Sequence, residues 1–251
     1  MSRSLFTYTQ ERFLVIAPVM SYIRAMKVSK LIMKCKEPNN SCHPTGWPAG
    51  RPMKTNEAIK ITHTLSKPSK MPGFAIGIPA KECKTGSKLR KIKGSVCYGC
   101  YALKGCYVFP DVQAAQYKRL KAITNPLWVA AMAQQINSKK SKVFRWHDSG
   151  DVQDEAHLLK IFAVCKLTPS VKHWMPTREA WTKHFLPLCP DNLIIRFSMP
   201  MIDQPAAGTW SHTSTVVTSG ATCPAPKQDG KCGDCRRCWD KSIPNIAYGK
   251  H

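Results

Sequence analysis

Cysteine is the residue type whose number and spacing in this sequence could do chemistry. The chain has 12 cysteines among 251 residues. Several of them follow C-x2-C spacings, and no recognisable secretory signal accompanies them. This combination is typical of metal ligands or redox thiols rather than of a disulfide framework.

The C-terminal segment, residues 222–251, contains the densest group of cysteines. Its members are Cys223, Cys232, Cys235 and Cys238. The last three follow a C-x2-C-x2-C pattern, so that three thiolates can reach one compact centre from a single loop, and Cys223, which precedes a proline, supplies a fourth. This pattern favours a [4Fe–4S] cluster, with tetrahedral zinc as the alternative. We expect the basic neighbours Lys231, Arg236 and Arg237 to lower the thiol pKa values.

A second group of cysteines lies upstream, in a lysine-rich loop. Cys83, Cys97 and Cys100 can hold a cluster that leaves one iron open, and Cys106 is a weaker fourth candidate. An open iron can bind a substrate or S-adenosylmethionine as well as pass electrons. One cluster shared between both groups of cysteines is a further possibility. Tyr101 and Lys104, which follow Cys100, are predicted to contact the bound cofactor.

The elements that must position these cysteines alternate between strands and helices. Short apolar runs predict strands over residues 74–78, 143–147, 171–175, 193–198 and 215–218. Helical spacing and capping residues predict helices over residues 111–122, 126–137, 154–167 and 178–186. Strand starts recur every 20 to 30 residues, which is the rhythm of a parallel α/β sheet. We therefore predict a partial or irregular TIM-like (β/α) barrel with a cysteine-rich metal-binding loop and a loop-like tail from Thr222.

Polar side chains follow the predicted strands at their carboxyl ends, where α/β folds place their chemistry. Arg145 and His147 alternate along one strand and are therefore expected to share a face. The candidate catalytic residues are Arg145, His147, Asp148, Asp151, Arg178 and Arg196, and Ser149 is a candidate cofactor contact. If the three arginines converge, they would suit a carboxylate or phosphate. A buried salt-bridge network with Asp151 or Asp154 as a helix N-cap is the structural alternative.

The charge of the chain is strongly basic. It has 38 Lys and Arg against 15 Asp and Glu, a net charge of +23. Residues 53–123 contain 14 basic and three acidic residues, a net +11. Such a field attracts nucleic acid, nucleotides or an acidic host protein. The sequence does not specify an oligomeric state, and its longest apolar run, residues 13–23, is too short to span a membrane.

Residues 1–52 differ from the remainder. They contain three internal methionines and a Pro-, Gly- and Asn-rich stretch over residues 39–52. We interpret them as an N-terminal extension, disordered or the product of a start codon assigned too early, with Cys35 and Cys42 outside any metal site. The iron–sulfur α/β domain is then residues 53–251.

Several motifs in order resemble the phage and prophage gene product 88 family. They begin at Cys97 (CYGCYALKG), Phe109 (FPDVQAAQ), Phe144 (FRWHDSGD), Pro176 (PTRE), Cys223 (CPAPKQ) and Lys231 (KCGDCR). The resemblance covers about residues 55–251. It implies an iron–sulfur protein on a TIM-barrel-like fold, encoded by a phage or prophage and located in the cytoplasm of the bacterial host. The Cys97–Tyr101 segment and Ser149 also give a distant likeness to radical S-adenosylmethionine proteins, although the first cysteine spacing differs from theirs.

Two functions remain open from the sequence. The first is a [4Fe–4S] protein, with one or two clusters, that performs redox or radical chemistry on an anionic or nucleic-acid-related substrate. The second is a non-catalytic module, stapled by zinc or a cluster, that binds nucleic acid or a host protein.

Overall fold

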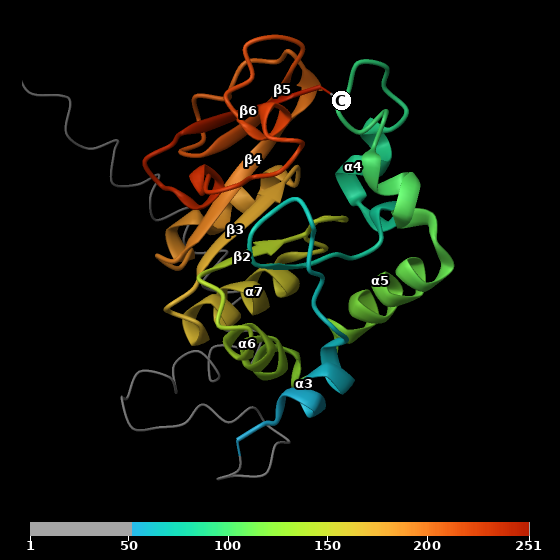
Figure 1. Ribbon diagram of the computed structural model, residues 1–251, viewed down its shortest axis with the longest axis vertical. Coiled ribbons are helices and arrows are strands. Elements are labelled where there is room, and N and C mark those ends of the chain that lie inside the picture. The colour runs from blue at the N-terminus through green and yellow to red at the C-terminus, as the bar shows by residue number, and fades with distance from the viewer. Residues whose placement is uncertain (1–51, 251) are drawn as a thin grey trace, which may run out of the picture. The chain divides into compact units, whose positions relative to one another are not determined.

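The computed structural model describes residues 52–250 (Figure 1). The described residues belong to one compact unit, residues 51–251. The predicted N-terminal extension, with Cys35 and Cys42, therefore lies outside the described residues except for Pro52. No helix in the described range is long and apolar enough to cross a membrane.

Six parallel strands form one sheet, and their order in the sheet is their order in the chain. The strands are β1 (Phe74–Ile76), β2 (Val143–Trp146), β3 (Lys172–Thr177), β4 (Leu193–Ile202), β5 (Thr213–Val217) and β6 (Asn245–Gly249). Each strand pairs in parallel with the next, and the β4–β5 register shifts between Ser198 and Ile202. The mixed α/β class and the parallel sheet are as predicted. Parallel strands place all their carboxyl ends at one edge, where chemistry can be assembled.

Helices connect the strands and cover the sheet. The α-helices are α3 (Thr55–Thr62), α4 (Lys84–Leu89), α5 (Pro110–Ala122), α6 (Trp128–Ser138) and α7 (Glu155–Leu167). The short 3-10 helices are η2 (Ala80–Glu82), η3 (Tyr101–Leu103), η4 (Gly105–Val108), η5 (Ala180–Leu188), η6 (Ala225–Lys227) and η7 (Arg237–Trp239). The Asp154 side chain accepts a hydrogen bond from the His157 backbone and caps α7, so Asp154, rather than Asp151, is the N-cap.

The main core lies between the sheet and the two helices α6 and α7, which pack against one of its faces (Figure 1). Phe144, Trp146 and Met175 supply the sheet side of this core, and Trp128 and Leu158 supply the helix side. Leu158, Ile161, Phe162 and Cys165 are all buried on α7, as their helical spacing predicts.

The tail covers part of the opposite face of the sheet. Trp239 of η7 packs edge-on against Trp174 of β3, with ring centroids 5.3 Å apart. Its indole N–H also donates a hydrogen bond of 2.8 Å to the carbonyl of Phe144. The tail is therefore fixed to β2 and β3 by an aromatic pair and a buried hydrogen bond.

Four elements differ from the sequence prediction. The tail is not entirely loop, because residues 245–249 form β6 and pair with β5. Residues 84–89, placed in a loop by their lysines and glycine, form α4, and residues 55–62 form α3. The helix predicted over residues 178–186 is the 3-10 helix η5, which contains Pro187. Proline lacks the N–H that a continuing α-helix needs.

Candidate functional site

The first group of thiols lies at the carboxyl edge of the sheet. Cys83 follows β1 and η2, and its thiol is close enough to Cys97 and Cys100 for the three to influence one another electrostatically. A methyl group placed on Gly86 would lie 3.6 Å from Cys97 Sγ and 3.7 Å from Cys83 Sγ. The two sulfurs therefore flank one point at the start of α4. We name Cys83, Cys97 and Cys100 the edge thiols.

A buried carboxylate holds α4 in this position. Glu179, which follows β3 and is 4% exposed, accepts hydrogen bonds from the Thr85 backbone at 2.9 Å and the Thr85 hydroxyl at 3.0 Å. The Trp181 indole N–H donates to the same carboxylate at 3.1 Å. Glu179 thus ties the residues directly after Cys83 to the end of β3. Glu179 is not among the predicted site residues, although it stands at a strand end beside Arg178.

Burial favours the neutral form of two edge thiols, Cys83 and Cys97. Burial raises the pKa of Cys83 to about 12, and the charges of Asp151, Cys100 and Cys97 raise it further. Burial also raises the pKa of Cys97, against the opposing effect of Arg178. Arg178 lowers both values, so it is the nearby cation that would favour thiolates.

The second group of thiols lies in the tail. Cys232 is its centre, because it interacts electrostatically with Cys223 and Cys235, and Cys238 interacts with Cys232. Cys223 is attached to β6 by a hydrogen bond from its N–H to the Ala247 carbonyl at 3.0 Å. Cys238 lies 3.2 Å from the hydroxyl of Tyr248, also on β6. We name Cys223, Cys232, Cys235 and Cys238 the tail thiols.

Both groups contain the same local turn. The Cys100 N–H donates to the Cys97 carbonyl at 3.2 Å, and the Cys235 N–H donates to the Cys232 carbonyl at 3.0 Å. The Cys97–Cys100 and Cys232–Cys235 pairs are therefore each closed by a backbone hydrogen bond, which brings the two cysteines of the pair to the same side of a tight turn.

The tail thiols correct one expectation. Their pKa values were expected to be lowered by Lys231, Arg236 and Arg237. Instead, burial raises the pKa of Cys238 to about 11 and also raises that of Cys232. Arg236 does lower the pKa of Cys232, as expected, but it does not outweigh burial, and Arg145 of β2 lowers the pKa of both thiols.

The described cysteines are all free thiols, without a disulfide among them. At Cys83, Cys97, Cys232 and Cys238, the neighbouring thiols that raise the pKa most belong to the same group. Within residues 52–250 no three His, Cys, Asp or Glu side chains converge as the ligands of one ion. Cys106 is exposed and takes part in neither group. Cys165 is buried in the core, and Cys189 is half-buried in the loop before β4.

Arg145 of β2 lies between the two groups of thiols. Its guanidinium stacks over the Trp174 ring, 4.7 Å from the centroid, and interacts with the tail thiols Cys232 and Cys238. It also donates a hydrogen bond of 3.3 Å to the hydroxyl of Tyr101, the residue after Cys100. Arg145 Nε is buried and has no hydrogen-bond partner among the described residues. Arg145 therefore contacts the residue that follows Cys100 and also interacts with two tail thiols.

Asp148, Ser149 and Asp151 form the loop after β2. The Tyr101 hydroxyl donates to the Asp148 carbonyl at 2.6 Å, while Asp148 Oδ1 is buried without a hydrogen-bond partner in the described part of the chain. The Ser149 hydroxyl donates to the Ile78 carbonyl and accepts from Gln116, both at 2.9 Å. Ser149 is thus engaged in joining β1, β2 and α5.

Asp151, which lies near the edge thiols, has a pKa close to neutral pH. Burial raises its pKa to about 6, although its carboxylate accepts hydrogen bonds from the backbone of Val152 at 2.7 Å and of Arg178 at 2.8 Å. A carboxyl group with such a pKa can give or take a proton near neutral pH.

The prediction that Arg145 and His147 share a strand face is wrong. The strand β2 ends at Trp146, and His147 has a φ of 56°, in the left-handed region. This turn places the His147 ring against His157 of α7, with centroids 5.4 Å apart. His147 is therefore packed on the helix-covered side, whereas Arg145 faces the tail.

The three candidate arginines do not converge. Arg196 is fully buried and donates to five backbone carbonyls, those of Thr213, Arg237, Cys238, Asp240 and Ile243, at 2.9–3.5 Å. All of its N–H donors bind these carbonyls, most of them in the tail, so no donor is left to bind an anion. Arg178 lies with the edge thiols, and its Nε is buried and unpartnered within the described range. Arg145 and Arg178 therefore remain as candidate anion contacts, while Lys104 is exposed between η3 and η4.

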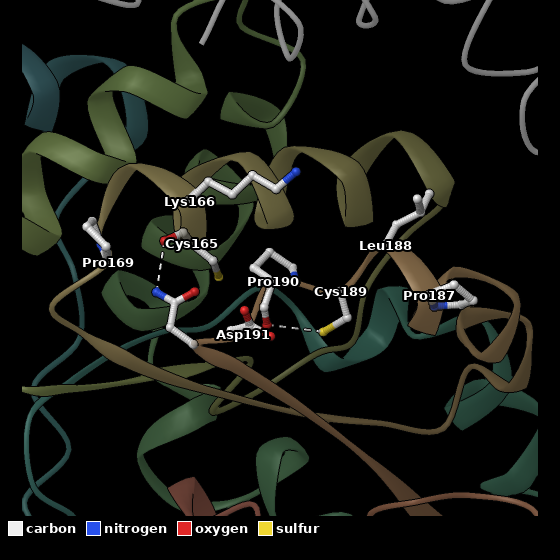
Figure 2. Close-up of a pocket in the computed structure, with 9 residues that line it drawn as sticks. Cys165, Lys166, Pro169, Pro187, Leu188, Cys189, Pro190 and Asp191 are labelled. Atoms are coloured by element: carbon white, nitrogen blue, oxygen red, sulfur yellow. Dashed lines mark hydrogen bonds between the residues drawn. The ribbon is translucent and has the colours of Figure 1, made fainter. Parts of the chain in front are cut away.

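A pocket lies away from both groups of thiols (Figure 2). It is lined by Cys165, Lys166, Pro169 and residues 187–192, which precede β3 and β4, so it belongs to the amino edge of the sheet. Figure 2 shows Cys165 and Cys189 at this pocket, with Lys166 along its rim. None of the predicted site residues lines it.

Comparison with known proteins gives one match. The sequence model of the family described as Gene product 88 matches residues 50–241. No match is found among curated proteins or among solved structures. The matched range includes the edge thiols, the tail thiols and Arg145, and it covers well over half of the chain. The protein therefore belongs to the gene product 88 family.

Proposed function

We propose that this protein is an iron–sulfur protein that holds two [4Fe–4S] clusters, one on the edge thiols and one on the tail thiols. The observation that carries the proposal is that thiols lie near one another within two groups, one over residues 83–100 and one over residues 223–238. Thiolates in C-x2-C turns are the usual ligands of such clusters. The donor set therefore fits the group.

The two sites differ in the number of thiols. The tail thiols supply four ligands, which suffice to enclose a cluster. The edge thiols supply three, so that one iron would remain open toward Asp151 and Arg178. A cluster with an open iron supplies electrons and a coordination site for a substrate or S-adenosylmethionine.

The residues around the edge thiols suit an anionic substrate. The unpartnered Nε atoms of Arg145 and Arg178 can donate to a carboxylate or phosphate. Asp151, with its pKa of about 6, can hold a proton at its carboxylate. We therefore propose redox or radical chemistry on an anionic substrate, in a protein encoded by a phage or prophage and active in the host cytoplasm. Parallel strands that follow one another in the sheet in chain order are typical of a (β/α) barrel, and we propose that this sheet is part of such a barrel.

The experiment that tests this function is metal and sulfide analysis after anaerobic purification. We expect about eight iron and eight sulfide ions per chain, four for each cluster. Cys97→Ser and Cys232→Ser are each expected to lower the iron content to about four per chain, because each removes a ligand from one group. Cys106→Ser is the matched control and should leave it unchanged. Zinc in place of iron, without sulfide, would contradict the proposal and favour a zinc-stapled binding module.

Gly86 gives a second test that leaves all thiols in place. A methyl group here would meet Cys83 Cβ at 3.0 Å and the two sulfurs beyond it. Gly86→Ala is therefore expected to reduce the iron held by the edge thiols, to between four and eight per chain. Gly99→Ala is the control, because no atom lies within 4 Å of its added methyl group. Equal iron contents of about four per chain in both variants would show that the edge thiols hold no cluster.

A radical reaction makes a further, separable claim. Reduced protein incubated with S-adenosylmethionine should then release 5′-deoxyadenosine. Protein that contains its full iron but releases none would retain the cluster proposal and refute the radical reaction.

A further inference from the structure

Large exposed hydrophobic side chains are concentrated in one segment of the described chain. Six of the seven lie between residues 92 and 117, and the seventh is Leu188. The six are Ile92, Tyr98, Tyr101, Val108, Phe109 and Tyr117, with exposed fractions of 43–60%. Four of them are aromatic, and a concentration of large exposed hydrophobic side chains in one segment is typical of an interaction site. We name these six side chains the aromatic surface.

The elements that carry the aromatic surface are packed together. The short helices η2, η3 and η4 form a contiguous chain of contacts from α4 to α5, beside the sheet (Figure 1). The Tyr101 and Tyr107 rings meet edge-on at 5.7 Å, and the Tyr117 hydroxyl donates to Glu82 Oε1 at 3.2 Å. The loop before Cys97 is fastened to β4, because Val96 N–H donates to the Pro200 carbonyl at 2.9 Å. The exposed rings are therefore carried by a layer of short helices that these contacts hold in place.

Positive charge surrounds the aromatic surface in the same elements. Eight lysines between residues 81 and 121 are exposed: Lys81, Lys84, Lys88, Lys91, Lys93, Lys104, Lys118 and Lys121. Within the described residues none of these ammonium groups makes an ion pair. Asp111 and Glu82 are the acidic residues of this range. The layer thus has a large unneutralised charge that complements a polyanion.

We propose that the aromatic surface binds single-stranded nucleic acid. Exposed rings offer stacking platforms for unpaired bases, and the lysines between them bind the phosphates; this is the combination by which proteins hold single strands without sequence preference. A duplex would satisfy the lysines but not the rings, because its bases are already stacked and paired. The inference is independent of the proposed clusters. If both hold, a bound strand would pass beside Cys97 and Cys100, which Tyr98 and Tyr101 adjoin.

Fluorescence anisotropy with a labelled oligothymidine of about 20 nucleotides, long enough for one such site, tests the proposal on the full chain. We expect binding that weakens steeply with salt, and weaker binding of a duplex of equal length. The double variant Tyr98→Leu, Phe109→Leu is expected to weaken single-strand binding at least tenfold, because each ring lost removes a stacking platform. Lys88→Gln with Lys91→Gln should reduce the slope of log K against log salt by about 1.4 if both contact phosphate.

Matched controls are Leu188→Ala and Lys183→Gln, exposed residues outside this layer, which should change neither affinity nor slope. Thermal unfolding and iron content are measured on every variant, so that loss of folding or of clusters is distinguished from loss of nucleic-acid binding. Absence of binding at low salt would overturn the proposal. Binding that depends on the lysines but is unchanged in the ring variant, or that is equal for duplex, would overturn it as well, and would leave only non-specific attraction of a basic protein.

Discussion

Replacing Arg196 by methionine is expected to destabilise the protein by about 4 kcal/mol, the largest single effect that we predict. The side chain is fully buried, and its guanidinium donates to five carbonyls, four of them in the tail between residues 237 and 243. Methionine fills a similar volume but leaves these acceptors without their donor. An unsatisfied buried acceptor costs about 1–3 kcal/mol, and breaking a buried charged network about 3–5 kcal/mol.

Urea unfolding of the purified variant measures this loss. Limited proteolysis should also cut the tail of the variant faster, because the tail loses the group that holds it to β4. Arg236→Met is the control, since Arg236 is exposed and bonds only to the nearby carbonyls of Gly233 and Cys235. A variant at Arg196 that unfolds at the same urea concentration as the Arg236 variant would contradict this reading of the buried network.

Acid is expected to unfold the protein through three buried histidines. Burial lowers the pKa of His157 to about 3 and that of His173 to about 4, and it lowers the pKa of His147 well below its usual value. In the unfolded chain a histidine titrates near 6.5. Between pH 6.5 and about 4 the unfolded state therefore binds more protons, and stability must fall as the pH falls.

The raised pKa of Asp151, about 6, acts in the opposite direction. Its native carboxyl keeps a proton that the unfolded chain releases, so its contribution to stability is lost as pH rises through this window. The three histidines outweigh this carboxyl, so that near pH 5 the unfolded state binds one to two more protons than the native state. The free energy of unfolding then changes by roughly 2 kcal/mol per pH unit.

Urea unfolding at a series of pH values measures the slope. His157→Gln is expected to lower it by about 1.4 kcal/mol per pH unit, the amount for one proton. His184→Gln, at an exposed position, should leave it unchanged. A free energy of unfolding that stays constant between pH 6.5 and 4.5 would mean that these histidines are not neutral and buried in solution.

Much of the fold follows from the sequence because its signals are local. The alternation of apolar strands with capped helices predicts five of the six strands and the helices α5, α6 and α7 within a few residues. The strand β6 is not predicted because its five residues, NIAYG, include only one β-branched residue together with Asn and Gly, and therefore have little preference for a strand. The helix α4, KTGSKL, is not predicted because it is only six residues long and contains a glycine. Hydrogen bonds from Thr85 to Glu179, which are tertiary contacts, stabilise it in the structure.

The residue types of the candidate site were predictable from the sequence. The directions in which their side chains point were less predictable. C-x2-C spacing identifies the thiols that the structure gathers into two groups, because that turn is local. The face occupied by His147 was not predictable, since a positive φ at a residue other than glycine or asparagine breaks the alternation without a sequence signal. The role of Arg196 depends on carbonyls from residues 213–243, and such long-range partners have no pattern in sequence.

The dependence of Arg196 on the tail has a consequence during translation. Arg196 leaves the ribosome more than 40 residues before Arg237–Ile243 supply most of its carbonyl acceptors. A nascent chain that buried β4 earlier would bury an uncompensated cation, at a cost of several kcal/mol. The sheet face of β4 is therefore expected to stay hydrated until the tail emerges. Docking of the tail and closure of this face then become a single late event, so that a prematurely terminated chain fails to complete its core and is left to cellular proteases.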